Sequence, residues 1–182
     1  MAGIDASFKL GGILLSKERI NQRVAELAAD INNEYRGERL IIVGVLKGAV
    51  IFMADLVRMI ESSIDVRMDF MAVSSYGNSS SSSGAVKIIK DMDTPAEGEH
   101  IILVEDIMDT GLTLSYLKDM LAARNPRSFR TCVLLEKPDR KTVECTIEYK
   151  GFEIPDKFVV GYGLDYAGKW RNLGDIWCLE EG

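Results

Sequence analysis

The chain has 182 residues, of which 47% are hydrophobic and 27% are charged, and its formal net charge is −6. These proportions are typical of one soluble globular domain. The negative charge disfavours nonspecific binding to nucleic acid, and no apolar run approaches the ~20 residues of a membrane helix. We therefore expect a cytoplasmic protein with neither nucleic acid nor membrane among its partners.

The cysteine and histidine content excludes several kinds of site. Cys132, Cys145 and Cys178 lie in apolar runs and form no CxxC pair, so we expect buried, reduced thiols. His100 is the only histidine, which argues against a histidine-based zinc site or a Ser-His-Asp triad. Charged residues and glycines interrupt the segment 1–15, which is therefore not expected to be a signal peptide.

The hydrophobic pattern alternates between strand-like and helix-like segments. In chain order it predicts a helix at 16–35 with Ser16 as N-cap, a strand at 40–46, a helix at 49–60, strands at 64–73, 85–90 and 101–104, a helix at 112–124, and strands at 131–135, 145–149, 158–160 and 176–179. Repeated units of buried strand, glycine turn and helix predict an α/β fold with a mostly parallel sheet flanked by helices.

An acidic segment follows the predicted strand 101–104 directly. Glu105 and Asp106 come first, then Asp109, then the small-residue turn 110–113 that opens a helix. Ligands of α/β sheets bind beyond the carboxyl ends of strands, and the N–H groups of such a turn can hold a phosphate. Carboxylates repel phosphate but suit Mg²⁺, sugar hydroxyls or proton transfer. The segment therefore predicts a site for a phosphorylated sugar.

An ordinary capping turn is the alternative interpretation of this segment. Asp109 or Thr110 could simply accept hydrogen bonds from the N–H groups of the helix that follows. A lone Asp-Thr-Gly sequence favours that interpretation, whereas the two carboxylates before it favour a ligand site.

The stretch from Val104 to Thr113, VEDIMDTGLT, resembles the phosphoribosyl pyrophosphate (PRPP) binding motif of the type I phosphoribosyltransferases. Other segments resemble the hypoxanthine-guanine members of that family, in the family's order and with compatible spacing: Val45–Ala49, Ser74–Gly77, Gly151–Tyr162, Leu164–Tyr166 and Arg171–Leu173. The resemblance covers roughly residues 14–180.

The resemblance implies a fold and an activity. The fold is a single phosphoribosyltransferase domain over 1–182, with a core of about 36–136 and a small hood from about 1–15 and 137–182. The activity is purine salvage: transfer of the phosphoribosyl group from PRPP to N9 of hypoxanthine or guanine, with Mg²⁺ as cofactor and pyrophosphate as the second product. A homodimer or homotetramer is also implied.

By resemblance, Asp109 is the general base toward purine N7, and Glu105 and Asp106 hold the ribose hydroxyls and Mg²⁺. The full set implied for PRPP comprises Glu105, Asp106, Asp109, Thr110, Gly111, Leu112 and Thr113. Lys47, Gly48 and Arg171 are implied for pyrophosphate, with a cis peptide bond before the lysine. Ser75 and Tyr76 match the family's mobile catalytic loop, which closes over PRPP.

The purine site is implied at Lys137, Phe158, Val159 and Asp165. Lys137 is the second catalytic residue: it donates to O6 of the base and so selects 6-oxopurines over adenine. Phe158 stacks on the ring, backbone groups near Val159 read the base edge, and Asp165 holds a second Mg²⁺.

Plainer interpretations remain for several of these residues. Lys47 and Lys137 could be solvated strand-end charges, and Phe158 could belong to the core. Asp165 and Arg171 could form a surface ion pair. Two other functions also remain open: a PRPP-binding regulator without catalysis, and a phosphoribosyltransferase for another base.

Overall fold

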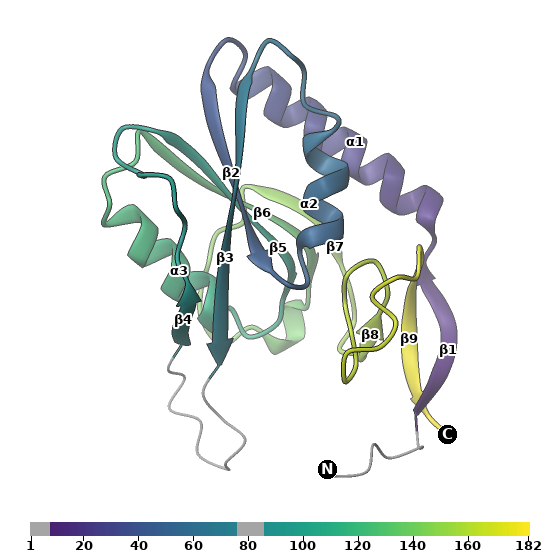
Figure 1. The fold of residues 1–182 in the computed structure, drawn as a ribbon. Helices are drawn as coiled ribbons and strands as arrows, with labels where there is room; N and C mark the ends of the chain where they lie inside the picture. Colours follow the sequence, from purple (N-terminus) through teal and green to yellow (C-terminus); the bar gives the residue numbers. More distant parts are fainter. Residues whose placement is uncertain (1–7, 76–85) are drawn as a thin grey trace.

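The computed structural model describes residues 8–75 and 86–182, which form two sheets (Figure 1). The large sheet has the order β4-β3-β2-β5-β6-β7, with strands β2 (Arg39–Leu46), β3 (Asp65–Ser75), β4 (Val86–Lys90), β5 (His100–Met108), β6 (Ser128–Glu136) and β7 (Tyr149–Glu153). Only β4 is antiparallel to its neighbour. The mostly parallel α/β fold predicted from the sequence is confirmed.

The small sheet is antiparallel and joins the two ends of the chain, as the resemblance implied. Its order is β1-β9-β8, with strands β1 (Phe8–Leu15), β8 (Val159–Val160) and β9 (Ile176–Glu181). β7 lies within the segment 137–182 that was expected to form the hood, yet it pairs with β6 in the large sheet.

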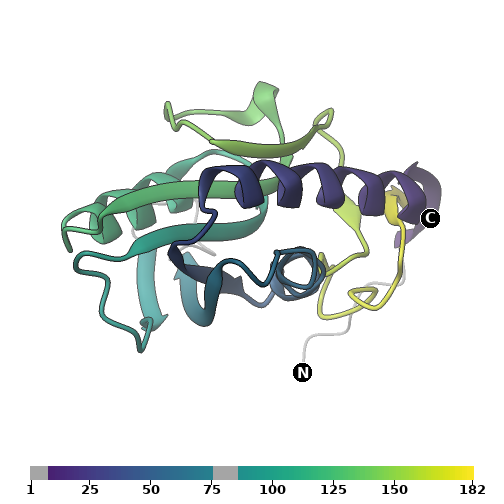
Figure 2. The ribbon, with the colours of Figure 1, turned by 90° about the horizontal axis from the view of Figure 1, so that it is seen from above.

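Helices cover both faces of the large sheet: α1 (Lys17–Glu34) and α2 (Val50–Val57) on one face, and α3 (Leu112–Ala122) on the other (Figure 1). A single 3-10 turn, η1 (Pro138–Arg140), follows β6. Seen from above, α1 extends from the small sheet to the large sheet (Figure 2). None of the helices in the described parts of the chain is long and apolar enough to cross a membrane.

The first helix forms as its sequence predicts. Ser16 is the N-cap, and its hydroxyl accepts a hydrogen bond from the backbone N of Arg19 at 3.4 Å. The apolar stripe one turn apart, which includes Ile20, Val24 and Leu27, is fully buried. This stripe packs against every second residue of β2 and β5 in one continuous core. The intervening residues of the same two strands point to the opposite face of the sheet and pack against α3.

Two strand predictions were wrong. β5 does not end at Val104, because its partner β6 continues the ladder through Met108 after the pairing with β2 has stopped at Val104. The predicted strand 145–149 is also absent, since only Tyr149 lies in β7. Before it, Glu148 accepts hydrogen bonds from the backbone N and the hydroxyl of Thr131, both at 2.8 Å, in place of a strand ladder.

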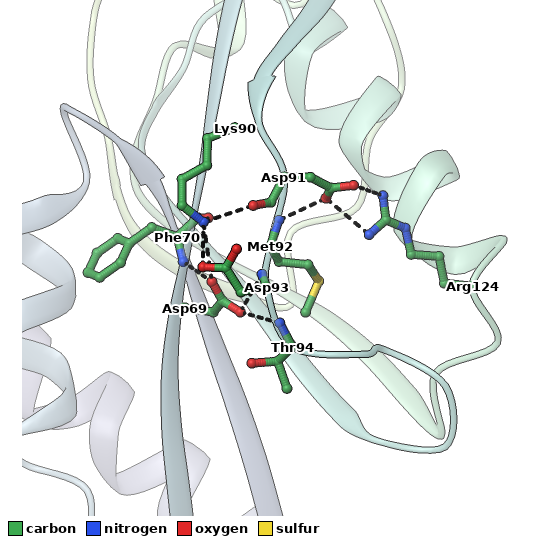
Figure 3. Close-up of polar contacts among 8 residues, drawn as sticks. All are labelled: Asp69, Phe70, Lys90, Asp91, Met92, Asp93, Thr94 and Arg124. Atoms are coloured by element: carbon green, nitrogen blue, oxygen red, sulfur yellow. Dashed lines mark hydrogen bonds and ion pairs between the residues drawn. The ribbon is translucent and has the colours of Figure 1, made fainter.

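A buried carboxylate ties the turn after β4 to β3 (Figure 3). Asp69 is 6% exposed, and its oxygens accept hydrogen bonds from the backbone N atoms of Phe70 at 2.7 Å, Asp93 at 2.9 Å and Thr94 at 2.8 Å. Burial by itself would raise the pKa of Asp69, but these N–H donors outweigh it and lower the pKa below its usual value. The ionised carboxylate therefore stabilises this end of the sheet.

We expect Asp69→Asn to lower the free energy of unfolding by about 2 kcal/mol at pH 7, because hydrogen bonds to a charged acceptor are lost. A lowered folded-state pKa stabilises the protein above the unfolded value of about 4, and this stabilisation is lost as the pH falls below it. Urea unfolding at pH 7 and at lower pH measures both effects. Asp93→Asn is the control, because the Asp93 side chain is 84% exposed. Equal stability of Asp69→Asn and wild type at pH 7 would contradict the assignment.

Candidate functional site

Two adjoining hollows lie at the carboxyl ends of the central strands, facing the small sheet. The larger has a volume of about 260 Å³ and is lined by Asp106, Ile107, Asp109, Lys137, Phe158, Val159, Leu164 and Asp165. The smaller, of about 90 Å³, is lined by Glu105, Ile107, Met108, Asp109, Thr110, Gly111, Thr113 and Leu114. Ile107 and Asp109 line both hollows, so the Asp109 side chain lies at their junction and can contact a ligand in either one.

The smaller hollow is a phosphate-sized cradle at the start of α3. Gly111 has φ 85, a left-handed conformation that suits glycine, and a Cβ there would lie 2.9 Å from the carbonyl oxygen of Val143. The N-cap Gly111 has no side chain to cap the helix, and Leu112 N makes only a long hydrogen bond of 3.4 Å to the Thr110 hydroxyl, so the N-terminus of α3 can still offer N–H groups to an anion. Thr110 and Thr113 add hydroxyls at the same place. The turn can hold a phosphate, as its sequence predicts.

Glu105 and Asp106 lie in strand β5 and not in a turn, which corrects the sequence-based picture of an acidic turn. Burial, followed by the neighbouring charge of Asp106, raises the pKa of Glu105 well above its usual value. Burial also raises the pKa of Asp106 to about 6, although the backbone N of Ile107 partly offsets it with a hydrogen bond at 2.9 Å. Among the described residues, Glu105 Oε2 has no hydrogen-bond partner.

The residues expected to hold pyrophosphate come together at the end of β2. The Leu46–Lys47 peptide bond is cis, as the resemblance implied. A Cβ at Gly48 would overlap the carboxylate of Asp106, so only glycine allows this close approach. Gly163 packs against the carbonyl oxygen of Gly48 in the same way. Its own carbonyl accepts a hydrogen bond from Arg171 Nη1 at 2.5 Å, which brings the guanidinium to this loop.

The far wall of the larger hollow carries the residues expected to hold a purine. Lys137 is 8% exposed, and its Nζ contacts Asp156 Oδ1 at 3.3 Å. Phe158 is 52% exposed, and its ring meets that of Tyr166 edge to face with the centroids 5.6 Å apart. Val159 is buried in β8. Asp165 pairs with Arg171 at 2.6 Å.

Two charged residues beside this wall were not predicted. Arg140 donates from Nε to Asp109 Oδ1 at 3.0 Å, and Asp156 accepts from Lys137. Asp156 lies in the segment 151–162 that carries the resemblance, but no local pattern distinguishes either residue from an ordinary surface charge. Of the two residues expected in a mobile loop, Ser75 is the last residue of β3 and pairs with Val86, whereas Tyr76 lies outside the described residues.

Known proteins share both the sequence and the fold. A family model described as a phosphoribosyl transferase domain matches residues 12–167. Hypoxanthine-guanine phosphoribosyltransferase of Bacillus subtilis is 50% identical over 168 residues, 92% of either chain, and that of Mycobacterium tuberculosis H37Rv is 49% identical over 92% of this chain and 85% of its own. A crystal structure of the Bacillus anthracis enzyme of the same name matches with a TM-score of 0.88 at 43% identity, over 95% of this chain and 99% of that one.

The phosphate-sized cradle depends on glycine at position 111. Gly111→Ala should lower the free energy of unfolding by roughly 1–2 kcal/mol through its left-handed φ, and by about 1 kcal/mol more through the clash with the Val143 carbonyl. Gly37→Ala is the matched control: its φ is 79, but nothing lies within 4 Å of the new Cβ. Urea denaturation compares the two. If Gly111→Ala cost no more than Gly37→Ala, the close contact with Val143 would be refuted.

Proposed function

The chain belongs to the phosphoribosyl transferase family. From this premise we propose which of its residues bind each part of the substrates and which take part in the transfer. The protein is a hypoxanthine-guanine phosphoribosyltransferase-type enzyme of purine salvage, as its curated relatives and solved structural neighbours are. It transfers the phosphoribosyl group of PRPP to N9 of a purine base and releases pyrophosphate. The observation that supports our assignment of roles is the pair of hollows that meet at Asp109.

The smaller hollow would hold the sugar phosphate. The 5′-phosphate accepts hydrogen bonds from the N–H groups of 110–113 and from the hydroxyls of Thr110 and Thr113. Glu105 and Asp106 face the ribose hydroxyls, which donate to the two carboxylates. These carboxylates also stabilise the positive charge that develops on the sugar when the bond from C1′ to the pyrophosphate oxygen breaks.

The donor set fits Mg²⁺. Mg²⁺ in phosphate-transfer sites is bound by one or two carboxylates, with substrate oxygens and water completing the shell. Glu105 offers an oxygen without a hydrogen-bond partner among the described residues, and Asp106 lies next to it. Asp165, whose oxygens contact Arg171 Nη2 and Gly168 N in the structure, would hold a second ion. Bound Mg²⁺ would neutralise charge on the pyrophosphate as it leaves.

Pyrophosphate itself would lie over the Lys47–Gly48 loop. Gly48 has no side chain of its own, so the backbone N–H groups of this loop would be the donors to pyrophosphate beside the Asp106 carboxylate. Arg171, which reaches the same loop through Gly163, supplies a planar guanidinium that can grip two phosphate oxygens.

The larger hollow would hold the base. Phe158 stacks on the ring, and backbone groups near Val159 contact its edge. Lys137 donates to O6, a hydrogen bond that the amino group of adenine cannot accept. Asp109 accepts the proton at N7 as N9 forms its bond to C1′, because an ionised carboxylate at this position can act as a general base.

We propose further that the enzyme is cytoplasmic and forms a homodimer or homotetramer, and that 1–182 is one functional domain. The three cysteines are free and buried, which is typical of a reducing compartment. The family match spans strands of both sheets, which favours one domain. Light scattering of the purified protein tests the oligomeric state.

An assay with PRPP, Mg²⁺ and one base at a time tests the proposed substrates. Hypoxanthine and guanine should each yield the nucleotide and pyrophosphate, whereas adenine should react at least about 10²-fold more slowly, because its amino group leaves Lys137 without an acceptor. Chromatography of the nucleotides measures the rates. Faster reaction with adenine than with hypoxanthine would refute the role of Lys137, and an enzyme inactive with every base would refute the proposed function.

Asp109→Asn should reduce kcat by about 10²–10⁴-fold, because the amide cannot accept the proton, while PRPP binding measured by calorimetry stays near the wild-type value. Asp119→Asn, at an exposed position of α3, is the control for loss of one negative charge. Unchanged turnover in Asp109→Asn would remove this residue from its role as base.

A further inference from the structure

Four charged side chains form a continuous chain beside the larger hollow. Lys137 Nζ lies 3.3 Å from Asp156 Oδ1, Arg140 Nη1 lies 3.9 Å from Asp156 Oδ2, and Arg140 Nε lies 3.0 Å from Asp109 Oδ1. The two candidate catalytic groups, Asp109 and Lys137, are therefore the ends of one chain of ion pairs. Arg140 and Asp156 are its middle members, and neither has a role so far.

Backbone contacts hold Arg140 in place independently of its charge. Lys137 N donates to the carbonyl oxygen of Met108 at 3.0 Å, and Thr142 N donates to that of Thr110, also at 3.0 Å. The hydroxyl of Thr142 donates to the same oxygen of Thr110 at 3.1 Å. The segment on either side of Arg140 is thus anchored to the residues on either side of Asp109. An arginine on a short, anchored turn has far less freedom than one on a loose surface loop.

The contacts of Arg140 and Lys137 use specific carboxylate oxygens of Asp109 and Asp156, which can fix the orientation of both carboxylates. Arg140 takes Oδ1 of Asp109, which leaves Oδ2 without a hydrogen-bond or ion-pair partner among the described residues. Asp156 offers one oxygen to Lys137 and the other to Arg140. Two carboxylates and two cations balance one another. Without Arg140, Lys137 would be the one cation of this set facing two carboxylates.

We propose that Arg140 and Asp156 are positioning residues of the transfer reaction. Arg140 orients the Asp109 carboxylate so that its free oxygen faces N7 of the base, and Asp156 holds the Lys137 ammonium where O6 of the base will lie. This inference rests on the proposed function, because it assumes that Asp109 and Lys137 contact the purine. A planar guanidinium on a carboxylate fixes the carboxylate's orientation, which a point charge does less well.

Steady-state kinetics of Arg140→Met, Arg140→Lys and Asp156→Asn test the proposal. Both partners of Arg140 are half exposed, so a moderate effect is expected: Arg140→Met should lower kcat about 5–20-fold, with the KM for PRPP within about two-fold of wild type. Arg140→Lys should recover part of the lost kcat, since lysine restores the positive charge but not the planar guanidinium. Asp156→Asn should raise the KM for hypoxanthine about 3–10-fold, because Lys137 is no longer held.

Two variants serve as matched controls. Arg127→Met removes an arginine whose 3.0 Å ion pair with Glu38 lies at the amino ends of β6 and β2, away from the site at the carboxyl ends, and Asp139→Asn removes an exposed carboxylate from the same turn as Arg140. Both should keep kcat and KM within about two-fold of wild type. The double variant Arg140→Met/Asp156→Asn should lose less in kcat/KM than the product of the two single losses, because the two residues belong to one chain of contacts.

The outcomes separate this inference from the proposed function. If the wild-type protein transfers no phosphoribosyl group, the proposed function fails. If wild type is active but Arg140→Met resembles Arg127→Met, or if its loss appears in the KM for PRPP and not in kcat, the positioning role of Arg140 is overturned. Full recovery of kcat by Arg140→Lys would equally overturn it, since charge alone would then suffice.

Discussion

The site depends on the register between two parallel strands. Met108, the last residue of β5, is paired with Glu136, the last residue of β6, so the residues that follow, Asp109 and Lys137, leave the sheet side by side. The hydrogen bond from Lys137 N to the Met108 carbonyl extends this pairing by one step. Because successive side chains of a strand point to opposite faces, a slip of one residue would exchange the faces of Glu105 and Asp106, which line different hollows. Buried apolar residues along both strands oppose such a slip.

This register also has an electrostatic cost. Continuing β5 past its pairing with β2 places Glu105 and Asp106 where burial raises the pKa of both. In the described chain, the hydrogen bond from Ile107 N and, to a smaller extent, the positive charge of Arg171 partly lower the pKa of Asp106. In the proposed function, sugar hydroxyls and a divalent cation would be the partners of these two carboxylates.

The sequence correctly predicted the elements that are determined by residues close to them in the chain. The capped helix from Ser16, the buried strands around Ile42 and Ile102, and the glycine turn before α3 each follow from neighbouring residues. Within the site, the family resemblance placed most lining residues of both hollows.

The elements that were missed depend on distant partners. The sequence predicted that β5 ends at Val104, because carboxylates usually mark a strand end, whereas the pairing with β6 extends the strand to Met108. β1 forms only because β9, at the other end of the chain, pairs with it. The contact between Arg140 and Asp109 depends on η1 folding back over β5, and nothing near Arg140 in the sequence reveals it.

The small sheet has a consequence for synthesis on the ribosome. Phe158 is held by a hydrogen bond from Leu179 N to its carbonyl oxygen at 2.8 Å, and Val159 pairs with Cys178. The strand that supplies these partners, β9, is translated after every strand of the large sheet, because the last of those is complete by Glu153. In the proposed function, a nascent chain would therefore complete the hollow around Gly111 before the wall that carries Phe158. Base binding would wait until β9 has been synthesised and has paired with β8.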